Sequence, residues 1–211
     1  YYSDYMVSTG KEMLNPGVTE LGLLNRMITE TVDKMIIDLG EVIYVPGGPA
    51  GALIPSGIRT STPHALPSAR KVEKGDNMIL STGTNEPDKQ KIDAFEVMRK
   101  AQLYGIELMK PGAICEEVEK EVARFITDAG YGDYIKHRTG HGKGLEEHEP
   151  PYVAAGDQTI MRPGMAFSSE PGIYIEGLAG FRHSDNVIIT DSGCEVITKY
   201  PKDLESVTLN I

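Results

Sequence analysis

The densest group of chemically reactive side chains in the chain is His137-Arg138-Thr139-Gly140-His141-Gly142-Lys143-Gly144-Leu145-Glu146-Glu147-His148-Glu149-Pro150-Pro151. It contains three of the five histidines of the chain. Glycines on both sides of His141 let the backbone and the imidazole approach a small ligand closely. Histidine supplies either a metal-binding nitrogen or a proton carrier near neutral pH. A loop whose histidines only cap turns is the alternative, but three histidines in one glycine-rich stretch favour a functional site.

Two later segments also carry polar residues next to apolar strands. They are Ser168-Ser169-Glu170-Pro171-Gly172-Ile173-Tyr174-Ile175 and Gly180-Phe181-Arg182-His183-Ser184-Asp185-Asn186. Glu170 leaves an apolar strand just before Pro-Gly, where strand ends can line a cleft. Charged residues that enter an apolar strand must be paired or functional if they are buried. A simple turn and a salt-bridged strand edge remain the alternatives for these two segments.

One order of turns, helices and strands occurs twice in the chain, which indicates an internal repeat. Asn15-Pro16-Gly17 and Lys110-Pro111-Gly112 each precede a segment whose apolar residues recur at helical spacing. Further on, Lys74-Gly75-Asp76 and Arg162-Pro163-Gly164 each read as a turn that enters a short apolar strand. We therefore expect two related α+β halves, at about residues 1–91 and 92–211.

Other elements follow from the same patterns. Ile92 to Met109 has the apolar spacing of another amphipathic helix. The tail should form strands at 186–190 and 195–198, with a turn between them. The stretch from Tyr44 to Pro67 is rich in Gly, Pro, Ser and Thr and carries His64, so we expect a long loop or an edge strand there.

Composition limits the functions that are open to the chain. Its 211 residues and 23.0 kDa suit one domain built from two small halves. A net charge of −10 argues against nucleic acid as a partner, and no run approaches the roughly 20 apolar residues of a membrane span. Cys115 and Cys194 are far apart in the sequence, so we expect free thiols and a reducing cytoplasm.

Together these segments resemble the pita-bread peptidases, the family of prolidase, aminopeptidase P, methionine aminopeptidase and creatinase. The family signature reads Gly-His-Gly-x-Gly-Leu-x-x-His-Glu, then Glu-Pro-Gly-Ile-Tyr, then Arg-x-Glu-Asp, and the chain matches the first two almost letter for letter. The resemblance implies an α+β pita-bread catalytic domain over residues 1–211. It also implies a hydrolase that cleaves an Xaa-Pro dipeptide or a similar small amide, a homodimer, and an N-terminal domain outside this sequence.

The resemblance also assigns roles to single residues. His141 and Glu170 resemble two of the metal ligands, and His148 resembles the histidine that contacts the substrate. His137 and His64 match further pocket histidines that bind substrate, and Arg182 matches the arginine beside the last ligand. By the resemblance, these three residues and His148 form the expected catalytic set. In that branch two divalent ions, of Mn, Co or Zn, activate a water that attacks the scissile carbonyl.

The sequence departs from the family at the remaining ligand positions. Five protein ligands are expected, but the last glutamate position holds Ser184, and the repeat places the first aspartate at Ser81. A stretch of roughly 15–20 residues, judged from the length of a strand with its turns, is absent after Gly83. Either the strand pair is lost, or a segment between Gly83 and Thr84 is missing from the sequence. A metal-free creatinase-like amidohydrolase and a non-catalytic module that binds a peptide or protein are therefore alternatives.

Overall fold

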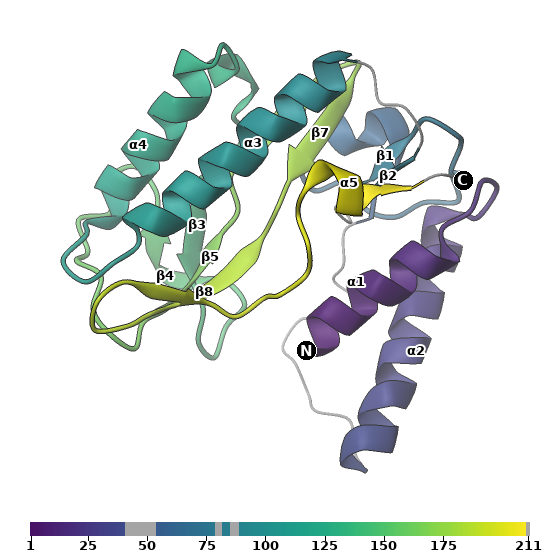
Figure 1. The fold of residues 1–211 in the computed structure, drawn as a ribbon, viewed down its shortest axis with the longest axis horizontal. Coiled ribbons are helices and arrows are strands. Elements are labelled where there is room, and N and C mark those ends of the chain that lie inside the picture. Colours follow the sequence, from purple (N-terminus) through teal and green to yellow (C-terminus); the bar gives the residue numbers. More distant parts are fainter. Residues whose placement is uncertain (41–53, 79–81, 85–88, 210–211) are drawn as a thin grey trace. The chain divides into compact units, whose positions relative to one another are not determined.

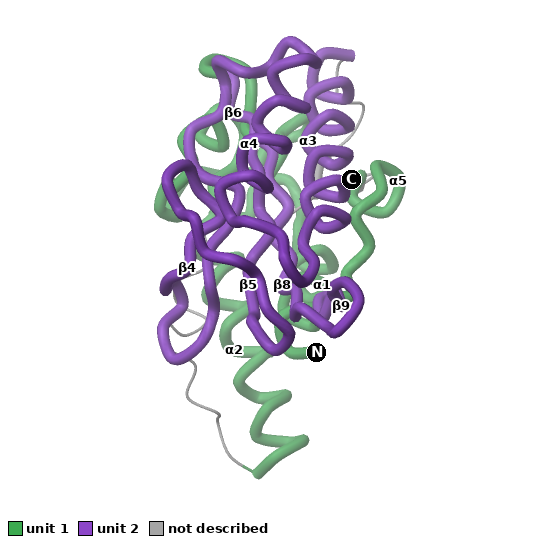
Figure 2. The backbone as a smooth tube through the Cα atoms, turned by 90° about the vertical axis from the view of Figure 1, so that its left-hand side faces the viewer, with its two compact units in different colours: residues 1–88, 176–180, 199–211 green, residues 89–175, 181–198 purple. Residues whose placement is uncertain are grey.

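The computed structural model describes residues 1–40, 54–78, 82–84 and 89–209, so Ser81 lies outside the described residues. The chain forms two compact units (Figure 2). Unit 1 comprises residues 1–88, 176–180 and 199–211, and unit 2 comprises residues 89–175 and 181–198. Two segments from the expected second half, 176–180 and 199–211, thus belong to unit 1.

Unit 1 is built from two packed helices and a small sheet. Helix α1 spans Tyr2–Met13 and helix α2 spans Glu20–Leu39, with the 3-10 helix η2 at Gly57–Ser61 and the short helix α5 at Leu204–Val207. Strands β1 (Asn77–Met78), β2 (Thr82–Thr84) and β10 (Thr208–Leu209) form a three-stranded sheet in the order β1-β2-β10. Buried apolar side chains form its core: Leu14, Leu23, Leu24, Met27, Ile54, Val72 and Met78.

Unit 2 combines two long helices with the larger sheet (Figure 1). Helix α3 spans Lys89–Leu108 and helix α4 spans Cys115–Asp128; they pack on each other and both contact the sheet. The antiparallel sheet has the order β4-β3-β5-β8-β9, and the 3-10 helix η3 lies at Gly132–Tyr134. Its strands are β3 (Gly140–Gly142), β4 (Glu149–Val153), β5 (Ala166–Ser169), β8 (Asp185–Ile189) and β9 (Cys194–Val196). Strands β6 (Gly172–Ile175) and β7 (Ala179–Arg182) pair separately.

The elements agree with the sequence patterns to within a few residues. The helix expected from Ile92 starts three residues earlier, at Lys89. The two expected tail strands are found at Asp185–Ile189 and Cys194–Val196. Of the expected loop from Tyr44 to Pro67, only residues 54–67 are described, and they contain η2 and a bridge from Ser56 to Met78.

The internal repeat is visible as one hydrogen-bond pattern that occurs in both units. In unit 1 the amide of Gly17 donates to Val72 O (2.8 Å), and the amide of Val72 donates back to Val18 O (2.8 Å). In unit 2 Gly112 donates to Met161 O (3.0 Å), and the amide of Met161 donates to Ala113 O (2.8 Å). Gly17 and Gly112 have φ of +94° and +88°, a backbone region that favours glycine. The two Pro-Gly turns therefore share one backbone conformation and one pattern of hydrogen bonds.

The cysteines and the helices bear on the expectations of free thiols and of no membrane span. Both cysteines are free; Cys115 is buried, and burial raises the pKa of its thiol to about 11. Among the described helices, none is long and apolar enough to cross a membrane.

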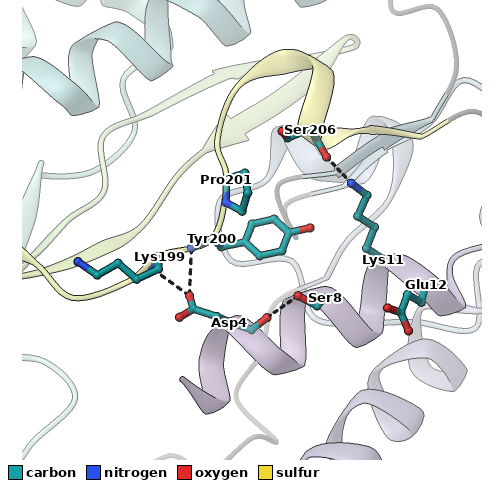
Figure 3. Close-up of a pocket in the computed structure, with 8 residues that line it drawn as sticks. All are labelled: Asp4, Ser8, Lys11, Glu12, Lys199, Tyr200, Pro201 and Ser206. Atoms are coloured by element: carbon teal, nitrogen blue, oxygen red, sulfur yellow. Dashed lines mark hydrogen bonds between the residues drawn. The ribbon is translucent and has the colours of Figure 1, made fainter.

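A hollow of about 630 Å³ in unit 1 lies between α1 and the C-terminal segment (Figure 3). Asp4 Oδ1 accepts hydrogen bonds from the amides of Lys199 and Tyr200, both at 3.2 Å. Lys11 Nζ donates to the carbonyl of Ser206. Since these charged groups already hold the C-terminal segment against α1, we assign the hollow a structural role.

A buried carboxylate at the start of α2 organises the segment that carries His64. Glu20 is 0% exposed, and its Oε1 accepts from Ser56 N (2.7 Å), Ser56 Oγ (2.8 Å) and Arg59 Nε (3.3 Å). Its Oε2 accepts from Ser68 N (2.8 Å) and Ser68 Oγ (2.6 Å). Burial alone would raise the pKa of Glu20, but the hydrogen bonds from Ser68 and Ser56 outweigh it and lower the pKa.

We expect Glu20→Gln to lower the free energy of unfolding by about 3 kcal/mol at pH 7, because an amide cannot satisfy the donors that surround the carboxylate. A lowered folded pKa means that the carboxylate stabilises the fold above its ordinary pKa of 4.5, and that this contribution is lost as the pH falls through the folded pKa. The difference between the two proteins should therefore shrink below pH 4.5. Urea unfolding at pH 7 and at a series of lower pH values measures it.

Glu30→Gln is the matched control, since Glu30 is an exposed residue of the same helix. It should change the free energy of unfolding by less than about 0.5 kcal/mol. Equal unfolding curves for the Glu20 and Glu30 variants would contradict the role given to Glu20.

Candidate active site

His141 is held in the centre of the large sheet of unit 2. It lies in β3, which pairs with β4 and β5, and it is 2% exposed. Its amide donates to Ser168 Oγ at 3.0 Å, and its Nδ1 lies 2.9 Å from Gly142 O. A carbonyl oxygen can only accept, so Nδ1 carries the proton of this contact. The other ring nitrogen, Nε2, is therefore the one that faces Glu170.

Glu170 faces that nitrogen. Its Oε1 lies 3.1 Å from His141 Nε2 and 3.4 Å from Ser168 Oγ, and its amide donates to Thr139 O at 2.7 Å. Burial would raise the pKa of Glu170, but the hydrogen bond to His141 and the charge of Arg182 outweigh it and lower the pKa to about 2. Glu170 is thus a carboxylate at neutral pH. His141 and Glu170 thus lie together, and their role as metal ligands stays a prediction.

His148 completes a cluster with these two residues. Its ring centroid lies 4.0 Å from that of His141, and the ring planes are tilted by 38°. Desolvation, and then the neighbouring His141, lower the pKa of His148, so its imidazole is neutral near pH 7. The metal-ligand atoms of His141, His148 and Glu170 all lie within 4.8 Å of one another. Two imidazoles and one carboxylate are donors that suit a divalent ion of the zinc type.

His137 and Arg182 are linked to this cluster through Tyr174. His137 Nδ1 lies 2.8 Å from Arg138 O, so the Tyr174 hydroxyl donates to His137 Nε2, at 2.8 Å. Tyr174 is 1% exposed, and burial raises its pKa to about 12, although Arg182 opposes that shift. Arg182 also lowers the pKa of Glu170. The Arg182 guanidinium supplies charged N–H donors that suit an anionic group of a small ligand.

The position of the missing family glutamate has no carboxylate to offer. Ser184 is exposed and follows the end of β7. The next residue, Asp185, is 0% exposed, and its oxygens accept from Gln102 Nε2 and Thr198 Oγ1. Asp185 is therefore committed to joining β8 to α3, and it does not replace the ligand that Ser184 lacks. His64 lies in a turn of unit 1 and is exposed, so its place in the site stays a prediction.

Sequence reasoning missed a carboxylate that positions the histidine strand. Glu119 in α4 accepts a hydrogen bond from Thr139 N at 2.6 Å, and burial raises its pKa. Thr139 also accepts from the amide of Glu170, so one residue joins α4, β3 and the segment after β5. The signal for Glu119 was its place next to the apolar stripe of Val118 and Val122.

The fold and this site are those of a pita-bread protein with a histidine–carboxylate centre. Residues 80–191, more than half of the chain, match metallopeptidase family M24. The chain belongs to metallopeptidase family M24, and its relatives make it a prolidase-like member.

Two curated relatives and two solved structures illustrate the likeness. The chain is 34% identical over 167 residues to the Xaa-Pro dipeptidase of Pyrococcus furiosus, which covers 72% of this chain and 48% of the relative. It is 32% identical over 218 residues to the Xaa-Pro dipeptidase of Lactobacillus delbrueckii subsp. lactis, covering 96% and 57%. The Xaa-Pro dipeptidase from Bacillus anthracis superposes with a TM-score of 0.87 at 31% identity, covering 99% of this chain and 60% of that one. The prolidase from Pyrococcus furiosus gives a TM-score of 0.83 at 29% identity, covering 95% and 61%. The chain thus spans about half to three fifths of the length of these relatives.

Proposed function

We propose that this chain provides the catalytic domain of a peptidase that cleaves an Xaa-Pro dipeptide, an Xaa-Pro peptide or a similar small amide. The observation that carries the proposal is the group formed by His141, His148 and Glu170, whose ligand atoms lie within 4.8 Å of one another. Support comes from the two curated relatives described above, both of which are named Xaa-Pro dipeptidase.

The residues of the site would divide the work as follows. A divalent ion held by His141 and Glu170 would supply an electrophile for the scissile carbonyl and acidify a water. Glu170 keeps its negative charge at working pH, and Gly142 O fixes the His141 tautomer that leaves Nε2 available. Arg182 would bind the substrate's carboxylate by charge-assisted hydrogen bonds, and His137, oriented by Tyr174, would contact the substrate. His64 would contribute a further contact with the substrate. Two roles are open to His148, contact with substrate or binding of the ion.

Hydrolysis of dipeptides tests the proposal. The purified chain should cleave dipeptides with a C-terminal proline faster than matched dipeptides without one, and chelation followed by Mn, Co or Zn should remove and restore the activity. His148→Ala should abolish hydrolysis and leave the thermal unfolding transition in place, because the side chain is exposed. Full activity in that variant, or no preference for proline, would exclude the proposal.

A metal-free amidohydrolase of the creatinase type is the second candidate. The observation in its favour is Ser184, an exposed hydroxyl at the position of a family carboxylate. In this reading His64 or His141 carries the proton. If the hydrolysis of a small C–N substrate continued after exhaustive chelation, the metal-free amidohydrolase would be the better candidate. A binding module without catalysis would show neither activity.

We further propose that the protein is a homodimer and works in the cytoplasm. The dimer rests on the family resemblance. Two free cysteines support a reducing compartment.

A further inference from the structure

We infer that this chain holds one divalent ion rather than a pair, in a three-ligand site made of His141, His148 and Glu170. The inference rests on the proposed function and deepens it, since it names the metal class and the number of ions. It also gives His148 a role as a ligand instead of a contact to the substrate.

The first step is the loss of the bridge that two ions would need. A bridging carboxylate is expected at position 184, where the chain has an exposed serine. The neighbouring carboxylate cannot move in, because both oxygens of Asp185 accept hydrogen bonds from Gln102 and Thr198 inside unit 2. A hydroxyl is a poor substitute for an anionic bridge between two cations. The side chain at position 184 therefore does not fit a site that holds two metal ions.

The second step is that the remaining donors fit one ion. His141 Nε2 and Glu170 Oε1 are 3.1 Å apart. Two ligands of a tetrahedral Zn²⁺ are separated by roughly 3.3 Å, given metal–ligand bonds of about 2.0 Å. The third ligand atom, on His148, lies within 4.8 Å of the other two. Because His148 is exposed, its ring can turn from its present contact with His141 to bring a nitrogen to the ion.

The third step concerns the groups behind the ligands. His141 donates its Nδ1 proton to Gly142 O, a contact that fixes the tautomer in the way metal-binding histidines require. Glu170 is held by Ser168 Oγ and, through its amide, by Thr139 O. These contacts orient two ligands before any ion binds. The fourth position of such a site stays open for water or substrate, as in catalytic zinc sites.

The donor set also selects the metal. Two imidazoles and one carboxylate favour Zn²⁺ or Co²⁺, whereas Mn²⁺ and Mg²⁺ prefer sites built from oxygen ligands. We expect the chain to bind Zn²⁺ more tightly than Mn²⁺, with one ion per chain.

Metal titration of the whole chain tests the inference without reference to turnover. The protein is stripped with a chelator and titrated with Zn²⁺ by calorimetry, and the bound metal is counted by mass spectrometry after dialysis. We expect one Zn²⁺ per chain and a loss of affinity of about 100-fold or more in His148→Ala, because one of three ligands is removed. Glu146→Ala is the matched control and should keep the affinity, since Glu146 is an exposed residue of the same segment outside the ligand group. The Co²⁺-loaded chain should show the intense visible bands of four-coordinate cobalt.

Three outcomes would overturn the single-ion site. They are two ions per chain, unchanged affinity in His148→Ala, and no stoichiometric binding of Zn²⁺. Dipeptide hydrolysis is measured on the same samples, which separates the two proposals. Hydrolysis with two bound ions would retain the proposed function and reject the single-ion site. One bound Zn²⁺ per chain without hydrolysis would retain the single-ion site and reject the proposed function.

Discussion

Replacing Glu170 by glutamine is expected to lower the rate of dipeptide hydrolysis by about 10³-fold or more while the protein stays folded. The carboxylate is anionic at any working pH, because its pKa is held at about 2. An amide of the same size keeps the shape of the site but removes the charge that faces His141 Nε2 at 3.1 Å. It also leaves Arg182 without its nearby anion. Steady-state kinetics at saturating metal and an unfolding curve for each protein measure the effect.

Glu146→Gln is the control for this experiment, because Glu146 belongs to the same histidine-rich segment and is exposed. It changes the net charge by the same amount and should keep most of the activity. A Glu170→Gln protein that retained most of its rate would show that this carboxylate takes no part in catalysis. The proposed site would then have to be rebuilt around other residues.

Local patterns predicted the parts of the fold that depend on short stretches of sequence. The Pro-Gly turns, the helices that follow them and the strand before Glu170 all depend on residues close in sequence. The repeat was also readable, because Gly17 and Gly112 adopt the same left-handed conformation in corresponding turns. The division into units was harder to predict. Residues 199–211 join unit 1 through contacts such as Lys199 with Asp4, which are far apart in the chain.

The residues of the candidate site also differ in whether a short stretch of sequence was enough to predict them. The family resemblance pointed to His141, His148 and Glu170, and the structure places them together. Glu119 and the partner of Asp185 were not predicted, because each contact joins residues 20 or more positions apart: Glu119 bonds to Thr139, and Asp185 to Gln102. A single sequence without the fold gives no signal for such pairs. Ser184 is exposed and Asp185 is buried because side chains alternate between the two faces of the sheet at the start of β8.

Among substitutions that add one methyl group to β3, the strand that carries His141, Gly140→Ala is expected to destabilise the protein most. A Cβ built at Gly140 would lie 2.0 Å from Ser168 O, a backbone atom of β5 that cannot rotate away. The strand that carries His141 would have to separate from the strand that leads to Glu170. Overpacking of this kind should cost at least about 3 kcal/mol in the free energy of unfolding. The melting temperature should fall by roughly 10 °C for a chain of this size.

Gly193→Ala supplies the matched control, since no atom lies within 4 Å of a Cβ built there. Its unfolding curve should differ from that of the unmodified chain by less than about 0.5 kcal/mol. Zn²⁺ affinity adds a second readout, because any Gly140→Ala protein that still folds must hold His141 and Glu170 farther apart, and its affinity should drop. If Gly140→Ala were as stable as Gly193→Ala and bound Zn²⁺ equally well, the close contact between β3 and β5 would not be what positions the two ligands.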